Sequence, residues 1–406
     1  DVIVMQEKIY LFLTPSINGI GGAELYVRAK ALWLQDNGWD VCIVGAKDGV
    51  GTLGFGDAFF FWCPDLFIKP ACAGKNRMHR VLGRLNRIVR GYSKVHIESS
   101  LIRFAGWGEL LAAETGGVHQ IFHLAEGVPV LDEWERALLR KKEFACIKED
   151  YFLEVFGTSK IPDTNLEESR VLTAFQGNPV EDVPYDLGSI PEADCYIGCI
   201  SRLNKPYVAQ VFKAVSSFAK KHGDKRVAFI VVGESRNPIT AVRLKVLLLG
   251  RSNVFTRFTG SLAPLPKCLV SKFDVALEKA GTILAVARVG VPTIAYSHVD
   301  DACMGVIGFD CDKTLSGGES ASLNAENLLE DVLVKGKYSG DYRYDLGEYE
   351  QPNYESHFKY LSRTTDPGSQ YPCILEANFT VRSLLSSYFS YIKSRANHLA
   401  VRMLHK

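Results

Sequence analysis

Three glycines stand where this chain could bind an anion. Gly19, Gly21 and Gly22 lie between the apolar run "KIYLFLT" and an amphipathic stretch, which is followed by the second apolar run "WDVCIVGA". This order predicts a strand, a glycine turn, a helix and a second strand. In such a unit the turn lies at the carboxyl edge of a parallel sheet, where helix amides attract phosphate and glycine allows close approach. An ordinary tight turn is the alternative.

The glycine turn does not follow the pattern of nicotinamide enzymes. In "GIGGAE" the sixth position is Glu24, where the dinucleotide fingerprint G-x-G-x-x-G has its third glycine. An acid there also favours the first turn of the expected helix, because the helix N-terminus is partially positive.

A cationic pair, Arg202 and Lys205, follows the apolar run "CYIGCI". A run of this kind predicts a buried strand, so both side chains should leave its carboxyl end. A guanidinium binds phosphate through two parallel hydrogen bonds, and a lysine adds a point charge. The pair is therefore a candidate diphosphate site, with solvated loop cations as the alternative.

Histidines and acids also fall near the ends of expected strands. His123 and His119 share one face of the run "VHQIFHLA", and each is a candidate for a ligand contact or for a hydrogen-bonded structural role. Glu98 and Glu126 lie near strand ends, where they would orient a hydroxyl group of a ligand unless they are solvated surface carboxylates.

A further group of candidates lies in "FDVALEKAGT". Glu278 stands at an expected strand-to-helix turn, where its carboxylate would accept hydrogen bonds from hydroxyl groups of a ligand, and helix capping is the alternative. Gly281 and Thr282 open the expected helix, whose amides would face a phosphate.

Two more polar segments are interpreted as structural. Asn178, in "GNPVE", is expected to shape a loop. Asp310 and Asp312 form an Asp-x-Asp pair, an arrangement that can hold a divalent cation. Because the pair follows the last clear strand pattern, we interpret it as solvated loop acids and predict no metal site.

The segment "KNRMHRVLGRLNRIVRGYSK", residues 75–94, has the pattern of a basic amphipathic helix. Its apolar residues fall at helical spacing and predict a buried stripe: Met78, Val81, Leu82, Leu85, Ile88 and Val89. Arginines occupy much of the remainder: Arg77, Arg80, Arg84, Arg87 and Arg90. This face would suit an anionic membrane surface or an anionic acceptor, and an ordinary solvated face is the alternative. No RNA-binding or helix-turn-helix pattern accompanies it, so we predict no nucleic-acid partner.

Composition places the chain among globular proteins of two domains. It has 406 residues, 47% of them hydrophobic, and a net charge of +1. No apolar run is long enough to span a bilayer and no secretory start is visible, so we expect a cytoplasmic protein. The ten cysteines are scattered without metal-type spacing, which predicts reduced, structural thiols.

Strand and helix patterns alternate twice along the chain. The first series begins with residues 8–14 and ends near 178; the second begins at 195 and ends near 297, after the Pro- and Asp-rich stretch "EDVPYDLGSIPEAD". Each series predicts a doubly wound parallel sheet in an α/β fold. Past Asp310 the pattern weakens, although the last thirty residues are again helical with a basic end.

Taken in order, five segments resemble the GT-B nucleotide-sugar glycosyltransferases of the family 4 type. They are "GIGGAELYVRAKALWLQDNGWDVCIV", "IFHLAEGVP", "FQGNPVED", "IGCISRLNK" and "AGTILAVARVGVPTIAYS". The resemblance implies two Rossmann-like domains facing a cleft. It implies an acceptor domain over residues 1–187, a donor domain over 188–375 and a C-terminal helical segment over 376–406 that packs back toward the first domain.

The resemblance implies transfer of a sugar from a nucleotide-diphosphate donor to a glycan or lipid-linked acceptor, with retention, without a cofactor or metal, and at the inner face of the membrane. It assigns His123 to the acceptor side and Arg202, Lys205 and Glu278 to the donor. The chain departs from the family at Ala285, where the second of two glutamates is usual, and Glu278 fits the first only if the loop is one residue shorter. A non-catalytic GT-B-like subunit and a nucleotide-sugar epimerase are therefore alternatives.

Overall fold

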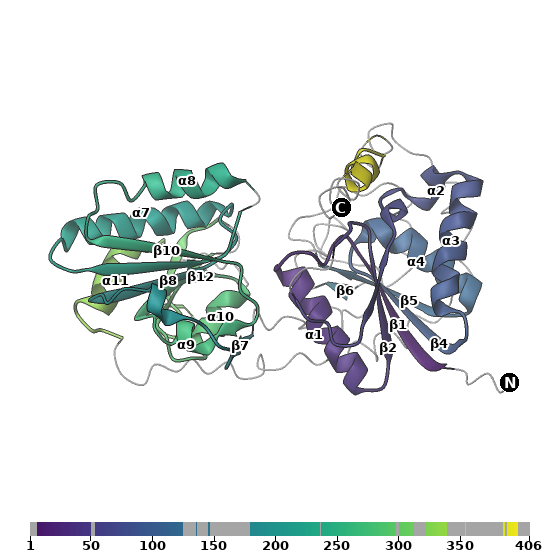
Figure 1. Ribbon diagram of the computed structural model, residues 1–406, viewed down its shortest axis with the longest axis horizontal. Coiled ribbons are helices and arrows are strands. Elements are labelled where there is room, and N and C mark those ends of the chain that lie inside the picture. Colours follow the sequence, from purple (N-terminus) through teal and green to yellow (C-terminus); the bar gives the residue numbers. More distant parts are fainter. Residues whose placement is uncertain are drawn as a thin grey trace, which may run out of the picture. The chain divides into compact units, whose positions relative to one another are not determined.

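The computed structural model divides the chain into two units, each described here by itself (Figure 1). The first unit contains Asp1–Phe175 and Pro352–Lys406, and the second contains Gln176–Gln351. The structure describes residues 6–49, 53–124, 135, 145–146, 179–235, 237–297, 300–311, 322–338, 354, 385 and 388–396.

The first unit contains a six-stranded sheet in which all paired strands are parallel. Its order is β3-β2-β1-β4-β5-β6, with β1 at Gln6–Thr14, β2 at Asp40–Gly45, β3 at Phe59–Trp62, β4 at Tyr92–Ser99, β5 at Val118–His123 and β6 at Ala145–Cys146. Residues 9–13 of β1 are fully buried, as expected for a strand covered on both faces. The alternation in the sequence predicts β1, β2, β4 and β5, but not the short strands β3 and β6.

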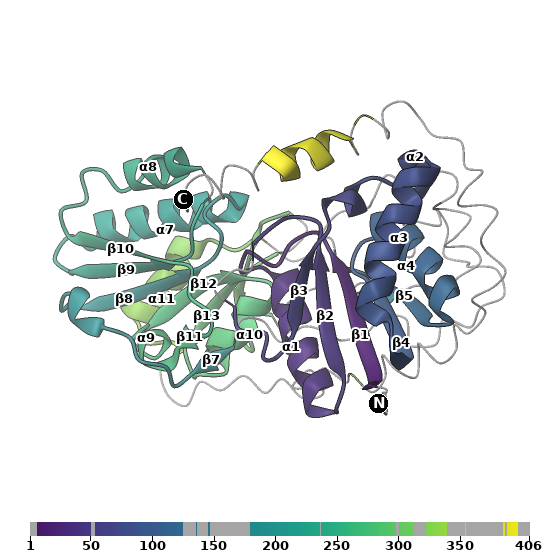
Figure 2. The same cartoon turned by 45° about the vertical axis from the view of Figure 1, so that its right-hand side comes forward.

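Helices cover both faces of this sheet (Figure 2). Helix α1 (Gly22–Asp36) connects β1 to β2 and packs on one face. The other face is covered by α2 (Pro70–Ala73), α3 (Lys75–Val89) and α4 (Ile102–Thr115), whose apolar side chains share one core with those of β1, β2 and β4. The first unit is therefore a three-layer α/β structure.

A buried ion pair fastens α1 to the sheet. Lys30 of α1 and Glu98 of β4 are both fully buried, with 2.5 Å between Lys30 Nζ and Glu98 Oε2. The hydroxyls of Tyr10 and Tyr26 also donate to the Glu98 carboxylate, at 2.5 and 2.9 Å. Burial lowers the pKa of Lys30, although the Glu98 carboxylate opposes this shift. Both roles suggested for Glu98 by the sequence, a ligand contact or a solvated acid, are wrong because its oxygens are bonded inside the core.

The basic helix α3 buries the apolar stripe that its sequence predicts. Val81, Leu82, Leu85 and Val89 are buried, while Met78 and Ile88 are partly buried against the same core. The arginines divide into two groups. Arg77 Nε lies 3.6 Å from Asp65 Oδ1 and Arg84 Nη1 lies 3.8 Å from Asp65 Oδ2, so these two do not belong to a purely solvated face. Arg80 and Arg87 are exposed.

The second unit contains another six-stranded sheet. Its order is β10-β9-β8-β12-β13-β14, with β8 at Cys195–Ile200, β9 at Val227–Val232, β10 at Val254–Gly260, β12 at Val275–Lys279, β13 at Thr293–Tyr296 and β14 at Cys303–Val306. The strands that the sequence predicts are paired in parallel, and β14, which the sequence pattern does not predict, adds to β13 in the antiparallel direction. A short connection of residues 297–302 reverses the chain there, where a parallel strand needs a long crossover.

Helices again form two outer layers. One core cluster contains side chains of α7 (Pro206–Lys221), α8 (Pro238–Val246) and α11 (Ala325–Leu333), and a second contains those of α9 (Lys267–Val270). Helix α10 (Gly281–Ala287) contributes Ile283 and Ala287 to the first cluster and Val286 to the second. Figure 1 shows α7 and α8 on one side of the sheet and α9 and α10 on the other. A small separate sheet pairs β7 (Val180–Glu181) with β11 (Leu265–Pro266). Helix α11 lies in the part of the chain where the sequence pattern is weak.

The C-terminal residues 388–396 are helical and pack on the first unit. Ser394 Oγ donates to the carbonyl of Ala46 at 2.8 Å, and the Tyr388 hydroxyl donates to the carbonyl of Cys72 at 3.4 Å. Among the residues that the structure describes, no helix is both long and apolar enough to cross a membrane.

Replacing Lys30 with Met should strongly destabilise the first unit, because the Glu98 carboxylate would stay buried without its ammonium partner. We expect Lys30→Met to lower the free energy of unfolding by about 3–5 kcal/mol in urea denaturation. The double variant Lys30→Met with Glu98→Gln removes both charges and should recover much of this loss. A cost below about 1 kcal/mol for Lys30→Met would show that the ion pair does not hold α1 to the sheet.

Candidate active site

Each sheet reverses its winding beside its first strand. In the first unit β2 and β3 lie on one side of β1 while β4, β5 and β6 lie on the other; in the second unit β9 and β10 lie on one side of β8, and β12 follows on the other. At such a reversal the connections leave in opposite directions, and ligands of open α/β sheets bind outside the carboxyl ends of the two strands. The candidate sites are therefore the loops after β1 and β4 and the loops after β8 and β12.

The structure places Arg202 and Lys205 at the second of these edges. They follow β8 directly, and the amide of Lys205 donates to the carbonyl of Arg202 at 3.1 Å in a turn. Arg202 is exposed and Lys205 is partly exposed. Lys205 is the N-cap residue of α7, and the first turn of this helix contains no acid. Two cations and a helix N-terminus thus stand together, which is a suitable environment for a diphosphate.

The loop with Arg202 is held by the neighbouring loop after β9. The amide of Leu203 donates to the carbonyl of Glu234 at 3.2 Å. Gly233 has φ = 143°, and a Cβ at this position would lie 1.9 Å from the carbonyl oxygen of Ser201. Only glycine permits this approach, so the backbone that carries Arg202 has a fixed position relative to β9.

The prediction that Glu278 stands in a strand-to-helix turn is wrong. Glu278 lies inside β12 and is fully buried, and its Oε1 accepts a hydrogen bond from the amide of Ile200 at 2.7 Å. The backbone pairing of β8 with β12 ends at Gly198 and Ala276. The Glu278 carboxyl group therefore joins the two strands past the point where their backbone pairing stops. Burial raises the pKa of Glu278 well above its ordinary range, although the hydrogen bond from the Ile200 amide opposes the shift.

The segment after Glu278 contains a strained residue. Ala280 has φ = 59° and ψ = −139°, a conformation that is costly for a residue with a Cβ. Gly281 then begins α10, and the Thr282 hydroxyl donates to the carbonyl of Lys279 at 2.8 Å. Lys279 also forms an ion pair with Asp301. These contacts bring Gly281 and Thr282 to the same sheet edge as Arg202.

Helix α10 offers no second carboxylate. Ala285, the position where the resemblance leads us to expect a second glutamate, is only 4% exposed, and the adjoining Val286 is fully buried in the core. A carboxylate at either position would have to leave water without a charged partner.

In the first unit the glycine turn lies against the side chain of Glu24. Gly19, Gly21 and Gly22 follow β1 as predicted, and α1 begins at Gly22. A Cβ at Gly21 would lie 2.7 Å from Glu24 Oε2, and a Cβ at Gly19 would lie 3.3 Å from Oε1. The Glu24 carboxylate therefore rests against this turn, a position that the sequence did not indicate. Any anion bound to the three glycines would face it.

The structure describes the backbone of one candidate histidine of β5, His123, and the side-chain contacts of the other, His119. His123 is the last residue of β5, with its backbone opposite Cys146 of β6, and its side chain lies outside the described structure. His119 is buried: its Nδ1 lies 2.5 Å from Glu109 Oε1 and its Nε2 lies 2.9 Å from Ser99 Oγ. A Cβ at Gly108 would clash with its ring at 2.2 Å. His119 therefore binds α4 to the sheet, and its candidacy for a ligand contact is wrong.

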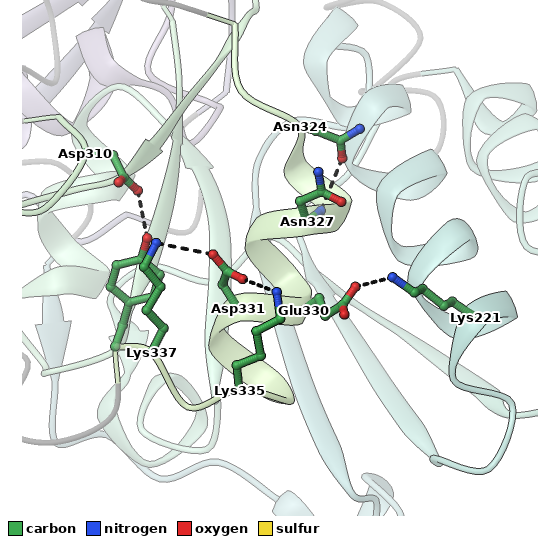
Figure 3. Close-up of polar contacts among 9 residues, drawn as sticks. Lys221, Asp310, Asn324, Asn327, Glu330, Asp331, Lys335 and Lys337 are labelled. Atoms are coloured by element: carbon green, nitrogen blue, oxygen red, sulfur yellow. Dashed lines mark hydrogen bonds and ion pairs between the residues drawn. The ribbon is translucent and has the colours of Figure 1, made fainter.

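The remaining candidates do not join a site. Asp310 is exposed, but its Oδ2 accepts hydrogen bonds from the amide of Val306 at 2.8 Å and from the Tyr338 hydroxyl at 3.1 Å (Figure 3). It therefore fixes the turn after β14 instead of being a freely solvated acid. Among the described residues no cluster of His, Cys, Asp and Glu could hold a metal ion. Glu126, Asn178 and Asp312 lie outside the described residues.

Solved structures share this fold. No family model and no curated protein matches the chain. The crystal structure of Anabaena Alr3699/HepE in complex with UDP and glucose has a TM-score of 0.54 at 12% identity, covering 88% of this chain and 97% of that one. A glycosyltransferase from Rickettsia africae has a TM-score of 0.50 at 13% identity, covering 98% and 99%. These likenesses confirm the predicted fold, a GT-B type α/β protein with two Rossmann-like units.

Glu278 should make the free energy of unfolding fall as pH rises, whereas an acid paired with a cation at the surface makes it rise. Above the ordinary value of 4.5 and below its raised native pKa, the folded protein keeps a proton that the unfolded chain releases. Stability should therefore fall as pH rises, by at most about 1.4 kcal/mol per pH unit. Glu278→Gln keeps the bond to Ile200 and should remove this slope.

Urea denaturation of both proteins between about pH 5 and about pH 8 measures this effect. Glu278→Ala is the structural control, because it leaves a cavity and an unsatisfied amide and should cost about 2–4 kcal/mol at every pH. Parallel pH profiles for wild type and Glu278→Gln would contradict the assignment of a neutral, buried acid.

Proposed function

We propose that this protein transfers a sugar from a nucleoside-diphosphate donor to a glycan or lipid-linked acceptor, with retention of the anomeric configuration and without a metal or cofactor. The observation that supports it is the position of Arg202 and Lys205 at the N-terminus of α7, where the second sheet reverses its winding. The fold is shared with a protein solved with UDP and glucose, Anabaena HepE. The cation pair is the part of this chain that would bind such a diphosphate.

The proposed reaction requires stabilisation of a departing diphosphate while the sugar gains positive charge. Arg202 would bind the phosphates in bidentate fashion and Lys205 would add charge, in an arrangement fixed before the substrate arrives. Gly281 and Thr282 would contact the donor from the other side of the winding reversal. Glu278 is a positioning residue in this mechanism, because its carboxyl group holds the end of β8 and is not exposed.

The first unit would bind the acceptor, with His123 at the carboxyl end of β5 as the candidate residue for that contact. The Glu24 carboxylate at the glycine turn disfavours a second phosphate site there. Gly19, Gly21 and Gly22 would then allow an acceptor hydroxyl to approach the backbone. The exposed cations of α3 would face anionic lipids if the acceptor is lipid-linked, which makes the protein peripheral on the inner face of the membrane.

A non-catalytic GT-B-like subunit is the second candidate function. It is favoured by Ala285, which offers no carboxylate where the resemblance leads us to expect the second glutamate. Such a subunit would bind carbohydrate or a partner transferase without donor turnover. Hydrolysis of a nucleotide sugar or transfer from it distinguishes the two functions, and an epimerase would convert the donor with no acceptor present.

Arg202→Ala should weaken binding of UDP or GDP by about 10-fold to 100-fold, since it removes charge-assisted hydrogen bonds to phosphate. Titration calorimetry measures the dissociation constant, and transfer should fall with it. Arg243→Ala is the matched control, because Arg243 is also an exposed arginine of the second unit but lies on α8, away from the carboxyl edge. Equal affinities of wild type and Arg202→Ala would refute the proposed diphosphate site.

A further inference from the structure

Two stretches of the sequence carry positive charge without any acid. Residues 69–94 contain eight lysines and arginines, residues 377–406 contain five, and neither stretch contains an aspartate or a glutamate. The structure brings their described parts together in the first unit. The Arg77 guanidinium lies 5.0 Å from the ring centre of Tyr391 and 5.6 Å from that of Tyr388, so the helix of residues 388–396, yellow in Figure 1, packs beside α3.

The C-terminal helix has one face that packs on the first unit. Ser394 is buried and donates to Ala46, and the Arg395 guanidinium lies 5.7 Å from the ring of Trp62. These contacts, together with those of Tyr388 and Tyr391, fix which side of the helix faces outward.

The outward side is an apolar stripe. Phe389 and Ile392 are 70% and 61% exposed, and their spacing of three residues places them on one face of the helix of residues 388–396. Leu385, a described residue that precedes this helix, is 64% exposed. Large apolar side chains in a row at this exposure mark an interaction surface. Lys393, next to the stripe, is exposed as well.

The adjoining helix α3 presents cations to solvent. Lys75, Arg80 and Arg87 are exposed, while Arg77 and Arg84 are turned toward Asp65. The first unit therefore exposes an apolar stripe on one helix and cations on the helix beside it, where Asn86 of α3 also holds the exposed Glu114 of α4 at 3.0 Å. That combination is complementary to an anionic bilayer, where apolar side chains enter the headgroup region and cations face the lipid phosphates.

We infer that the helix of residues 388–396 inserts Phe389 and Ile392 into an anionic membrane surface while α3 supplies the electrostatic attraction. The inference rests on the proposed membrane contact of α3, and it adds the apolar side chains that enter the membrane. Two weak signals together give stable peripheral binding where one alone is marginal. Neither signal needs a bound nucleotide, so membrane binding and sugar transfer are separable in experiments.

The test is sedimentation of the full-length protein with phosphatidylcholine vesicles, with and without phosphatidylglycerol. The variant Phe389→Ser with Ile392→Ser should lower the partition coefficient on anionic vesicles by about 10-fold or more. Arg80→Gln with Arg87→Gln should lower it by about 20-fold at low salt, with a smaller effect at high salt. In the variant Phe389→Trp, the fluorescence emission of the introduced indole should shift to shorter wavelength only when anionic vesicles are present.

The matched control lies on α8 of the second unit, which has exposed apolar residues between cations. Val242 and Val246 are 61% and 54% exposed, with Arg243 and Lys245 also exposed. Val242→Ser with Val246→Ser should leave vesicle binding unchanged, and so should Arg202→Ala, which tests the nucleotide site independently.

Three results would overturn the inference. The first is wild-type partitioning of the Phe389→Ser with Ile392→Ser variant. The second is an equal loss for the α8 control, which would mean that any exposed apolar group suffices. The third is a difference in particle mass between wild type and this variant in light scattering, together with equal vesicle binding. That result would mean that a second copy of the chain, and not a membrane, covers the stripe.

Discussion

Each sheet reverses its winding direction between its first and fourth strands, and the positions of the candidate residues follow from that constraint. Right-handed crossovers carry the chain to one side after β1 and β8 and to the other side after β4 and β12. The carboxyl ends of those strands are consequently left open by the connections. Residues that are remote in sequence meet there, as Ile200 and Glu278 do, 78 positions apart. Glycine at position 233 lets two of the loops touch without displacing Arg202.

In each unit a strand beside the winding reversal contains a buried carboxyl group, Glu98 in β4 and Glu278 in β12. The protein stabilises these two groups by different means. Glu98 is surrounded by the Lys30 ammonium and two tyrosine hydroxyls, which compensate the loss of water. Glu278 has no ammonium group recorded within bonding distance among the described residues, and its neutral form is favoured instead. In both units the buried acid joins elements that meet near the candidate site, so the geometry above it depends on the core.

Sequence reasoning identified features that are set locally and missed those that depend on distant partners. The alternation of apolar runs predicts β1, β8 and β12, and glycine or cation positions directly after a strand predict the turn before α1 and the Arg202 loop. Burial of Glu98 and Glu278 depends on Lys30 and Ile200, which no local pattern connects to them. The same limit explains Arg77 and Arg84: their partner Asp65 lies outside the basic segment. The outward positions of Phe389 and Ile392 are visible only once the inner face of their helix is known.

The turn after the first strand of the sheet has opposite charge in the two units. In the first unit an acid stands in the first turn of α1, where a negative charge stabilises the helix N-terminus. In the second unit Lys205 is the N-cap of α7 without a side-chain cap, and Arg202 precedes it. Cations are unfavourable at that end of a helix. A bound diphosphate would lower the cost of this charge distribution, because its two anionic groups would meet both the cations and the amides of the helix N-terminus.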